Sequence, residues 1–188
     1  MFSNRRKTKK APFPLARLSL LKDYHPESKE IPLSPPFQFA IDLIDKLSGL
    51  NKKFALIMLE TGARPVEILA LCSGHSHRNG SILITSAKNS QDRIAHSPTF
   101  RTMMPKENVD PTFQPFRYYS YRKFYRAVMK TGMIQTGTKL VHVPISRLFR
   151  QAYASIANDL SDGKLDVVAH TLGHKQSKNA EYYIQQKG

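Results

Sequence analysis

The sequence predicts a mainly α-helical domain that carries one small antiparallel β-sheet. Apolar residues recur at the spacing of one helical face in most segments between residues 34 and 184. Only residues 81–98 change to short β-like runs around a polar turn. Because 188 residues can enclose one ordinary hydrophobic core, we expect a single ordered domain over residues 34–188.

Residues 1–33 are expected to form a basic, proline-rich and flexible tail. Its prolines discourage regular structure. A block of like charges such as this is either a solvated arm or an arm that lies along a nucleic-acid backbone. The basic residues concerned are Arg5, Arg6, Lys7, Lys9 and Lys10.

The ordered part is expected to begin with three helices. Apolar residues recur at helical spacing in residues 35–49, and residues 52–60 are apolar enough to form a central helix. A Thr-Gly pair breaks the second helix, and Pro65 suits the first turn of a third. Arg64 therefore lies on a tight turn between two helices.

A hairpin and further helices follow. Residues 81–85 and 93–98 are expected to pair as strands, with Lys88 in the turn between them. The aromatic residues of segment 113–125 are expected to lie in the core. The remaining helices are expected at residues 120–130, 146–160 and 165–172, followed by a closing segment that ends near residue 184.

The charge of the chain indicates a polyanionic partner. Lysine and arginine total 29 against 14 acidic residues, which gives a formal net charge of +15. Basic side chains neutralise phosphates and release condensed counterions. An anionic membrane is the competing partner, but the sequence has no apolar run of about 18 residues and no amphipathic anchor. We therefore predict a nucleic acid and no membrane.

The cysteine and histidine content argues against a metal site. Cys72 is the only cysteine, which excludes an intrachain disulfide and a thiolate cluster, and a reducing, cytoplasmic compartment is expected. The basic N-terminus is not followed by the apolar core of a secretion signal. His75 and His77 have no third ligand nearby, so we interpret them as loop residues and expect neither metal nor cofactor.

Several polar residues suit one kind of chemistry together. Guanidiniums can clamp the non-bridging oxygens of a phosphodiester, and a tyrosine hydroxyl can attack its phosphorus. A lysine can protonate the departing 5′ oxygen, and a histidine can hydrogen-bond the phosphate or accept the tyrosine proton. Taken singly, each could be an ordinary capping or solvated residue. They are Arg64, Lys88, Arg147, Arg150, His174 and Tyr183.

Four segments, in unbroken order, resemble the motifs of the tyrosine recombinases. TGARPVEILAL (61–71) resembles the segment TGxRxxEL, and AKNSQDRI (87–94) resembles the lysine motif of their β-hairpin. SRLFRQAYAS (146–155) resembles HxLRHTFAS. LGHKQSKNAEYY (172–183) resembles their LGH segment, with a tyrosine nine residues beyond the histidine. The resemblance implies the fold of a tyrosine recombinase catalytic domain over residues 34–188.

The resemblance also implies a role for each matching residue. Arg64 and Arg150 would clamp the scissile phosphate, and Lys88 would be the general acid. His174 would be the histidine of the LGH segment, in the second half of the set of four motifs. Glu67 would be structural and would brace the turn that presents Arg64.

Tyr183 would be the nucleophile. Tyr182 is about 100° away round a helix, so only one of the two can face the phosphate, and the spacing from His174 favours Tyr183. Tyr182 would then be a packing residue. Double-stranded DNA would be contacted by the basic tail and also by Arg122, Lys123 and Lys175.

Three features depart from the family pattern. Arg147 replaces the histidine expected three residues before Arg150, and an arginine cannot act as a base at neutral pH, although it can bind phosphate. The usual N-terminal core-binding domain has no room here, which indicates a minimal recombinase or a catalytic fragment. Little sequence follows Tyr183, so its delivery within one subunit or between subunits stays open.

The resemblance implies a site-specific recombinase or integrase of prokaryotic, viral or plasmid origin. It would cleave and rejoin DNA through a 3′-phosphotyrosine intermediate, as a dimer or tetramer on DNA, to integrate or excise a mobile element. The alternatives are a DNA invertase, a hairpin-forming telomere resolvase and, from another class, a non-catalytic DNA-binding protein on the same fold.

Overall fold

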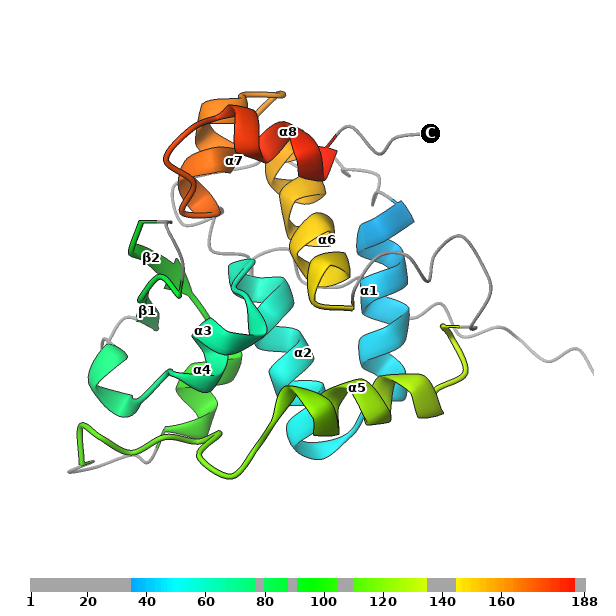
Figure 1. The fold of residues 1–188 in the computed structure, drawn as a ribbon, viewed down its shortest axis with the longest axis vertical. Coiled ribbons are helices and arrows are strands. Elements are labelled where there is room, and N and C mark those ends of the chain that lie inside the picture. Colours follow the sequence, from blue (N-terminus) through cyan, green and yellow to red (C-terminus); the bar gives the residue numbers. More distant parts are fainter. Residues whose placement is uncertain (1–34, 77–79, 88–90, 105–109, 135–144, 185–188) are drawn as a thin grey trace, which may run out of the picture.

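A buried helix, α6 (Ile145–Leu160), forms the centre of the fold. The computed structural model describes residues 35–76, 80–87, 91–104, 110–134 and 145–184. The helices that pack most extensively against α6 surround it (Figure 1). They are α1 (Pro35–Lys46), α2 (Gly49–Thr61), α7 (Leu165–Thr171) and α8 (Lys178–Ile184). The predicted fold class, mainly helical with one small sheet, is confirmed.

The sheet is a two-stranded antiparallel hairpin. Strands β1 (Ser81–Ile84) and β2 (Arg93–His96) pair in full register. Helix α3 (Pro65–Leu69) and a 3₁₀ turn, η3 (Ser73–His75), lead from α2 into this hairpin, and α4 (Pro98–Met103) and α5 (Tyr121–Lys130) follow it.

Helix α4 corrects the sequence prediction, which extended the second strand to residue 98. The Ser97 hydroxyl caps α4 by accepting a hydrogen bond from the Phe100 amide, and Pro98 occupies the first turn. The buried Glu60 carboxylate accepts hydrogen bonds of 2.6 Å from the hydroxyls of Ser97 and Thr99. These contacts hold the end of the hairpin against α2, near the turn that carries Arg64.

The aromatic segment 113–125 is only partly in the core, contrary to the sequence prediction. The Phe54 ring lies 5.1–5.2 Å, between centroids, from the rings of Phe116, Tyr119 and Phe124. Helix α5 turns the face of Phe124 and Val128 inward, which leaves Tyr125 on the outer side. Three aromatic side chains of the segment are therefore exposed, two of them before α5 begins. They are Phe113, Tyr118 and Tyr125.

Gly62 ends α2 in a conformation that requires glycine. Its φ is +62°, and a Cβ there would lie 2.4 Å from Cδ1 of the buried Tyr153 ring. We expect Gly62→Ala to lower the free energy of unfolding by about 2–4 kcal/mol, from backbone strain and overpacking together. Urea unfolding of Gly132→Ala is the matched control, because Gly132 has φ +69° and open space around its Cα. Equal losses in the two variants would contradict the packing argument.

Candidate active site

Arg64 lies in the turn between α2 and α3, at the N-cap of α3. The Glu67 carboxylate accepts one hydrogen bond of 2.8 Å from the Arg64 amide and another of 2.8 Å from its Nη1. The first bond satisfies an amide at the helix start, and the second holds the guanidinium. The Arg64 side chain stays 22% exposed, so the rest of its guanidinium is accessible to an anion.

Arg150 is a buried charge that joins the ends of two helices. Its Nη1 donates to the Gly62 carbonyl at 2.5 Å, and its Nη2 donates to the Leu172 carbonyl at 2.6 Å. Burial, with the positive charges of Arg64 and Arg93, lowers the pKa of Arg150 to about 10. The guanidinium is therefore still charged at neutral pH.

His174 follows the turn that ends α7. Its Nε2 lies 3.0 Å from Nη2 of Arg150. Since a guanidinium can only donate, Nε2 is the acceptor and Nδ1 carries the hydrogen. Nδ1 is buried and has no hydrogen-bond partner in the described part of the chain. Burial, with the charges of Arg150, Arg64 and Arg93, lowers the pKa of His174 to about 4. His174 is therefore a neutral imidazole with one unused donor.

The two tyrosines of α8 have different neighbours. The Tyr183 ring stacks on His174 with centroids 5.7 Å apart, and Cζ of Arg150 lies 5.5 Å from the Tyr183 centroid. The Tyr182 hydroxyl instead accepts a hydrogen bond of 2.5 Å from Nη1 of Arg147. Tyr182 is 50% exposed, so it is not simply a packing residue.

Arg93 is a site residue that the sequence analysis missed. Its side chain is buried, and its Nη2 lies 3.3 Å from Oε2 of Glu67. In β2, Arg93 and Ala95 face inward while Ile94 is exposed. A strand with Ile94 turned inward would place Arg93 on the exposed face, and the structure shows the reverse, so the pattern of the strand gave no signal.

These side chains form one electropositive group, which we call the arginine cluster: Arg64, Arg93 and Arg150, with Glu67 and His174. Burial alone would raise the pKa of Glu67, but the charge of Arg93, the Arg64 amide and the charges of Arg64 and Arg150 outweigh it and lower that pKa. Three guanidiniums against one carboxylate leave two net positive charges. The arrangement is suited to bind an anion with hydrogen-bond acceptors, such as a phosphate.

The other predicted residues lie elsewhere. Lys88, His77 and the basic residues of the tail fall outside the described residues. Lys175 is exposed next to His174, and Arg122 and Lys123 are exposed on α5. Helix α5 lies near the start of α2, whereas Arg64 follows its end (Figure 1). The structure therefore does not bring the α5 residues into the arginine cluster.

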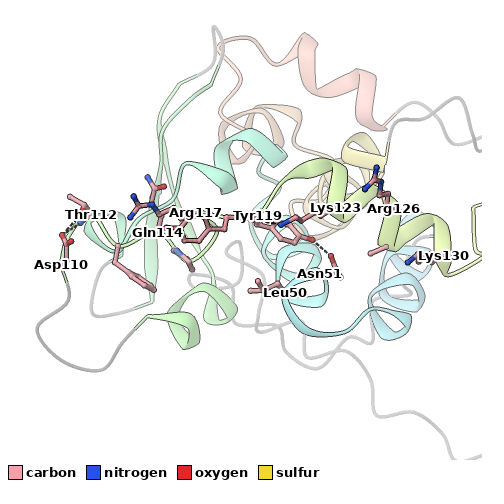
Figure 2. A pocket seen from close by; sticks show the side chains of 14 residues that line it. Leu50, Asn51, Asp110, Thr112, Gln114, Arg117, Tyr119, Lys123, Arg126 and Lys130 are labelled. Atoms are coloured by element: carbon pink, nitrogen blue, oxygen red, sulfur yellow. Dashed lines mark hydrogen bonds between the residues drawn. The ribbon is translucent and has the colours of Figure 1, made fainter.

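A second basic surface surrounds α5. An open groove of about 1220 Å³ runs between segment 110–119 and α5. Figure 2 shows its basic side chains on these two segments, and they are Arg117, Lys123, Arg126 and Lys130. The Lys123 ammonium donates to the Tyr118 carbonyl at 2.9 Å.

Within the described ranges, no three His, Cys, Asp or Glu side chains are grouped so that they could hold a metal ion. A search of the described helices finds none that combines the length and the apolarity needed to span a bilayer.

The pKa of His174 offers a direct test of anion binding. Because guanidinium charges contribute to its lowered pKa, a bound phosphate would offset them and raise the pKa. We expect dihydrogen phosphate to shift the His174 titration upward from about 4. The shift is measured by NMR of the imidazole, with chloride at equal ionic strength as the control and His174→Gln for assignment. A shift no larger than that with chloride would contradict anion binding here.

Solved recombinase structures share the fold. XerA recombinase superposes with a TM-score of 0.55 at 18% identity, covering 87% of this chain and 61% of that one. The catalytic domain of bacteriophage HP1 integrase gives 0.54 at 20% identity, with coverage of 81% and 86%. XerH recombinase, in a pre-cleavage complex with its difH substrate, gives 0.52 at 19% identity, with coverage of 81% and 50%.

The chain thus has the fold of a tyrosine recombinase catalytic domain. It spans 61% of XerA and 50% of XerH, so less than two thirds of either protein. No family model matches the sequence. No curated protein is matched by its sequence either.

Proposed function

We propose that this chain is a site-specific DNA recombinase that cleaves and rejoins strands through a 3′-phosphotyrosine. One observation carries the proposal: Tyr183, His174 and Arg150 lie against one another in a single chain. A potential nucleophile therefore stands beside the groups that suit a phosphodiester. Integration or excision of a mobile element is the task we propose, on double-stranded DNA and as a dimer or tetramer.

Arg64, Arg150 and His174 of the arginine cluster would hold the scissile phosphate. A guanidinium has five N–H groups, and Arg150 uses three of them on Gly62, Leu172 and His174. The remaining two would bind the non-bridging oxygens, and one of them is Nε–H, which is buried and has no partner among described residues. Arg64 supplies further N–H groups, and the Nδ1–H of His174 supplies one more. This geometry favours a phosphate-binding histidine over a basic one, because Nε2 is already occupied.

The reaction that we propose uses that placement together with the role that the resemblance implies for Lys88. The Tyr183 oxygen would form a bond to phosphorus while the bond from phosphorus to the 5′ oxygen breaks. The Tyr183 proton would pass to water, and Lys88 would supply a proton to the departing 5′ oxygen. A 5′-hydroxyl of a second strand would reverse these steps, release Tyr183 and give the exchanged product. The arginines stabilise the charge that develops on the non-bridging oxygens.

Arg147 supports a competing function of a different class. It occupies the position at which the resemblance expects a histidine, and it contacts Tyr182. A non-catalytic DNA-binding protein on the same fold would use such an arginine for affinity alone.

A DNA invertase or a hairpin-forming telomere resolvase would keep the chemistry and differ only in the substrate arrangement.

A covalent trapping assay separates these functions. The substrate is a duplex with a 5′-bridging phosphorothiolate or a nick, made from DNA that flanks the gene. We expect a protein–DNA adduct that survives denaturing electrophoresis, and mass spectrometry should locate the phosphate on Tyr183. Tight, site-specific binding of that duplex without any adduct would favour the DNA-binding protein instead.

A further inference from the structure

Arg93 is a buried charge with unused donors beside the proposed phosphate site. Its side chain is 3% exposed. Nη2 contacts Glu67, whereas Nε and Nη1 are buried and lack hydrogen-bond partners in the residues described. A buried charge is costly unless it is paired, so the position of Arg93 requires a reason beyond packing.

The first reason lies in Glu67, which two arginines share. Oε1 accepts from Arg64 at 2.8 Å, and Oε2 accepts from the Arg64 amide at 2.8 Å and from Arg93 at 3.3 Å. Burial is the largest influence on this carboxyl and opposes its ionisation, while Arg93 is the largest influence that favours it. Without Arg93, the carboxyl would become easier to protonate, and its charge-assisted contacts with Arg64 would weaken.

The second reason lies in the turn before His174. A Cβ on Gly173 would lie 3.2 Å from Nη1 and 3.4 Å from Cδ of Arg93. The amide of Gln91, two residues before Arg93, donates to the Gly173 carbonyl at 2.8 Å. Arg93 therefore packs against the turn that presents His174 as well as contacting Glu67.

We propose that Arg93 is a positioning residue for phosphodiester cleavage. It would hold Arg64 in place through Glu67 and would hold His174 in place through the Gly173 turn. It would not touch the substrate itself. The inference rests on the proposed recombinase function. It adds a guanidinium that links the turn carrying Arg64 to the Gly173 turn before His174. A purely structural Arg93 would affect folding but not the pH dependence of the folded enzyme.

The test compares Arg93→Gln and Arg93→Lys in the full chain, with Arg101→Gln as the matched control, because Arg101 is an exposed arginine on α4. Adduct formation is measured in single turnover on the trapping duplex, at equal folded fraction by circular dichroism. We expect Arg93→Gln to slow it by about 10–100-fold, since small misplacements of reacting groups have effects of this size. Arg93→Lys keeps the charge and should slow it by about 3–10-fold. Arg101→Gln should match the wild type.

The pH profile distinguishes positioning from folding. The charged groups that face Glu67 are Arg64 from its own turn, Arg93 from β2 and Arg150 from α6. The titratable His174, after α7, also interacts with it and has a pKa of about 4. With Arg93 neutralised, Glu67 would protonate at higher pH, so Arg93→Gln should gain an acidic limb and recover part of its rate as the pH rises. Adding Glu67→Gln to this variant should remove the limb. A loss of rate that is independent of pH would overturn the proposal.

The outcomes separate the two proposals. Absence of an adduct from wild-type protein bound to its site contradicts the recombinase function. A wild-type adduct, together with wild-type rates in both Arg93 variants, contradicts only the inference about Arg93. If Arg93→Gln does not fold, Arg93→Lys carries the test, and a rate equal to wild type in that variant overturns the inference.

Discussion

Replacing Tyr183 with phenylalanine is expected to abolish the covalent protein–DNA adduct and to leave the fold and DNA affinity intact. The substitution removes only the hydroxyl, while the ring that stacks on His174 remains. Loss of a nucleophile removes the covalent pathway, so adduct formation should fall by more than about 10³-fold. The measurement is the trapping assay, with a gel-shift titration of the same duplex for affinity and urea unfolding for the fold.

Tyr182→Phe is the matched control for this prediction. It removes a hydroxyl from the neighbouring residue, and the lost contact is the hydrogen bond from Arg147 at a half-exposed position. Such a bond is worth about 0.5–1.5 kcal/mol, so the rate should fall by no more than about 10-fold. An adduct that persists in Tyr183→Phe and disappears in Tyr182→Phe would show that the nucleophile is Tyr182.

Arg150→Lys is expected to impair both stability and cleavage, although it keeps the positive charge. Arg150 donates to the carbonyls of Gly62 and Leu172 from two different nitrogens, and one ammonium cannot reproduce that fork. At least one buried carbonyl would lose its donor. We expect the free energy of unfolding to fall by about 2–4 kcal/mol and the rate of adduct formation to fall by at least about 10²-fold.

Arg147→Lys, one turn earlier on α6, is the control for charge and helix context. Arg147 is only partly buried, and its described side-chain contact is with Tyr182. Exposed pairs of this kind contribute about 0–1 kcal/mol, so Arg147→Lys should unfold close to wild type in urea. Equal losses of stability in the two variants would contradict the bridging role of Arg150.

The positions of the helices could be predicted from the sequence more accurately than the burial of the side chains around them. Helices α1, α5, α6 and α7 follow the apolar period within a few residues, because one buried stripe decides where a helix begins and ends. Helix α2 was predicted instead from a continuous apolar run, and it is buried on most sides. Helix α4 was missed, since its short Ser97-Pro98 start was interpreted as the end of a strand. The exposure of Tyr118 and Tyr125 could not be predicted, because burial of an aromatic ring depends on packing between distant segments.

The residues of the candidate site could be predicted from the sequence, but the contacts between them could not. The order of motifs identified Arg64, Arg150 and His174, and the structure brings them together. Nothing in the order of residues indicates that Arg150 bonds the ends of α2 and α7, or that its Nη2 faces the imidazole. Arg93 was missed because its inward direction depends on the register of β2, which one residue of slip would reverse.

Under the proposed function, the excess positive charge of the arginine cluster would make DNA a stabilising ligand of the fold as well as a substrate. Repulsion from Arg64 and Arg93 acts on the buried Arg150, and a bound phosphodiester relieves it only in the folded chain. Any ligand that binds the folded state alone shifts the unfolding equilibrium by mass action. Protein away from its DNA would therefore unfold more readily and be more open to proteolysis. The cellular lifetime of the protein would thereby be linked to the number of DNA sites that it can occupy.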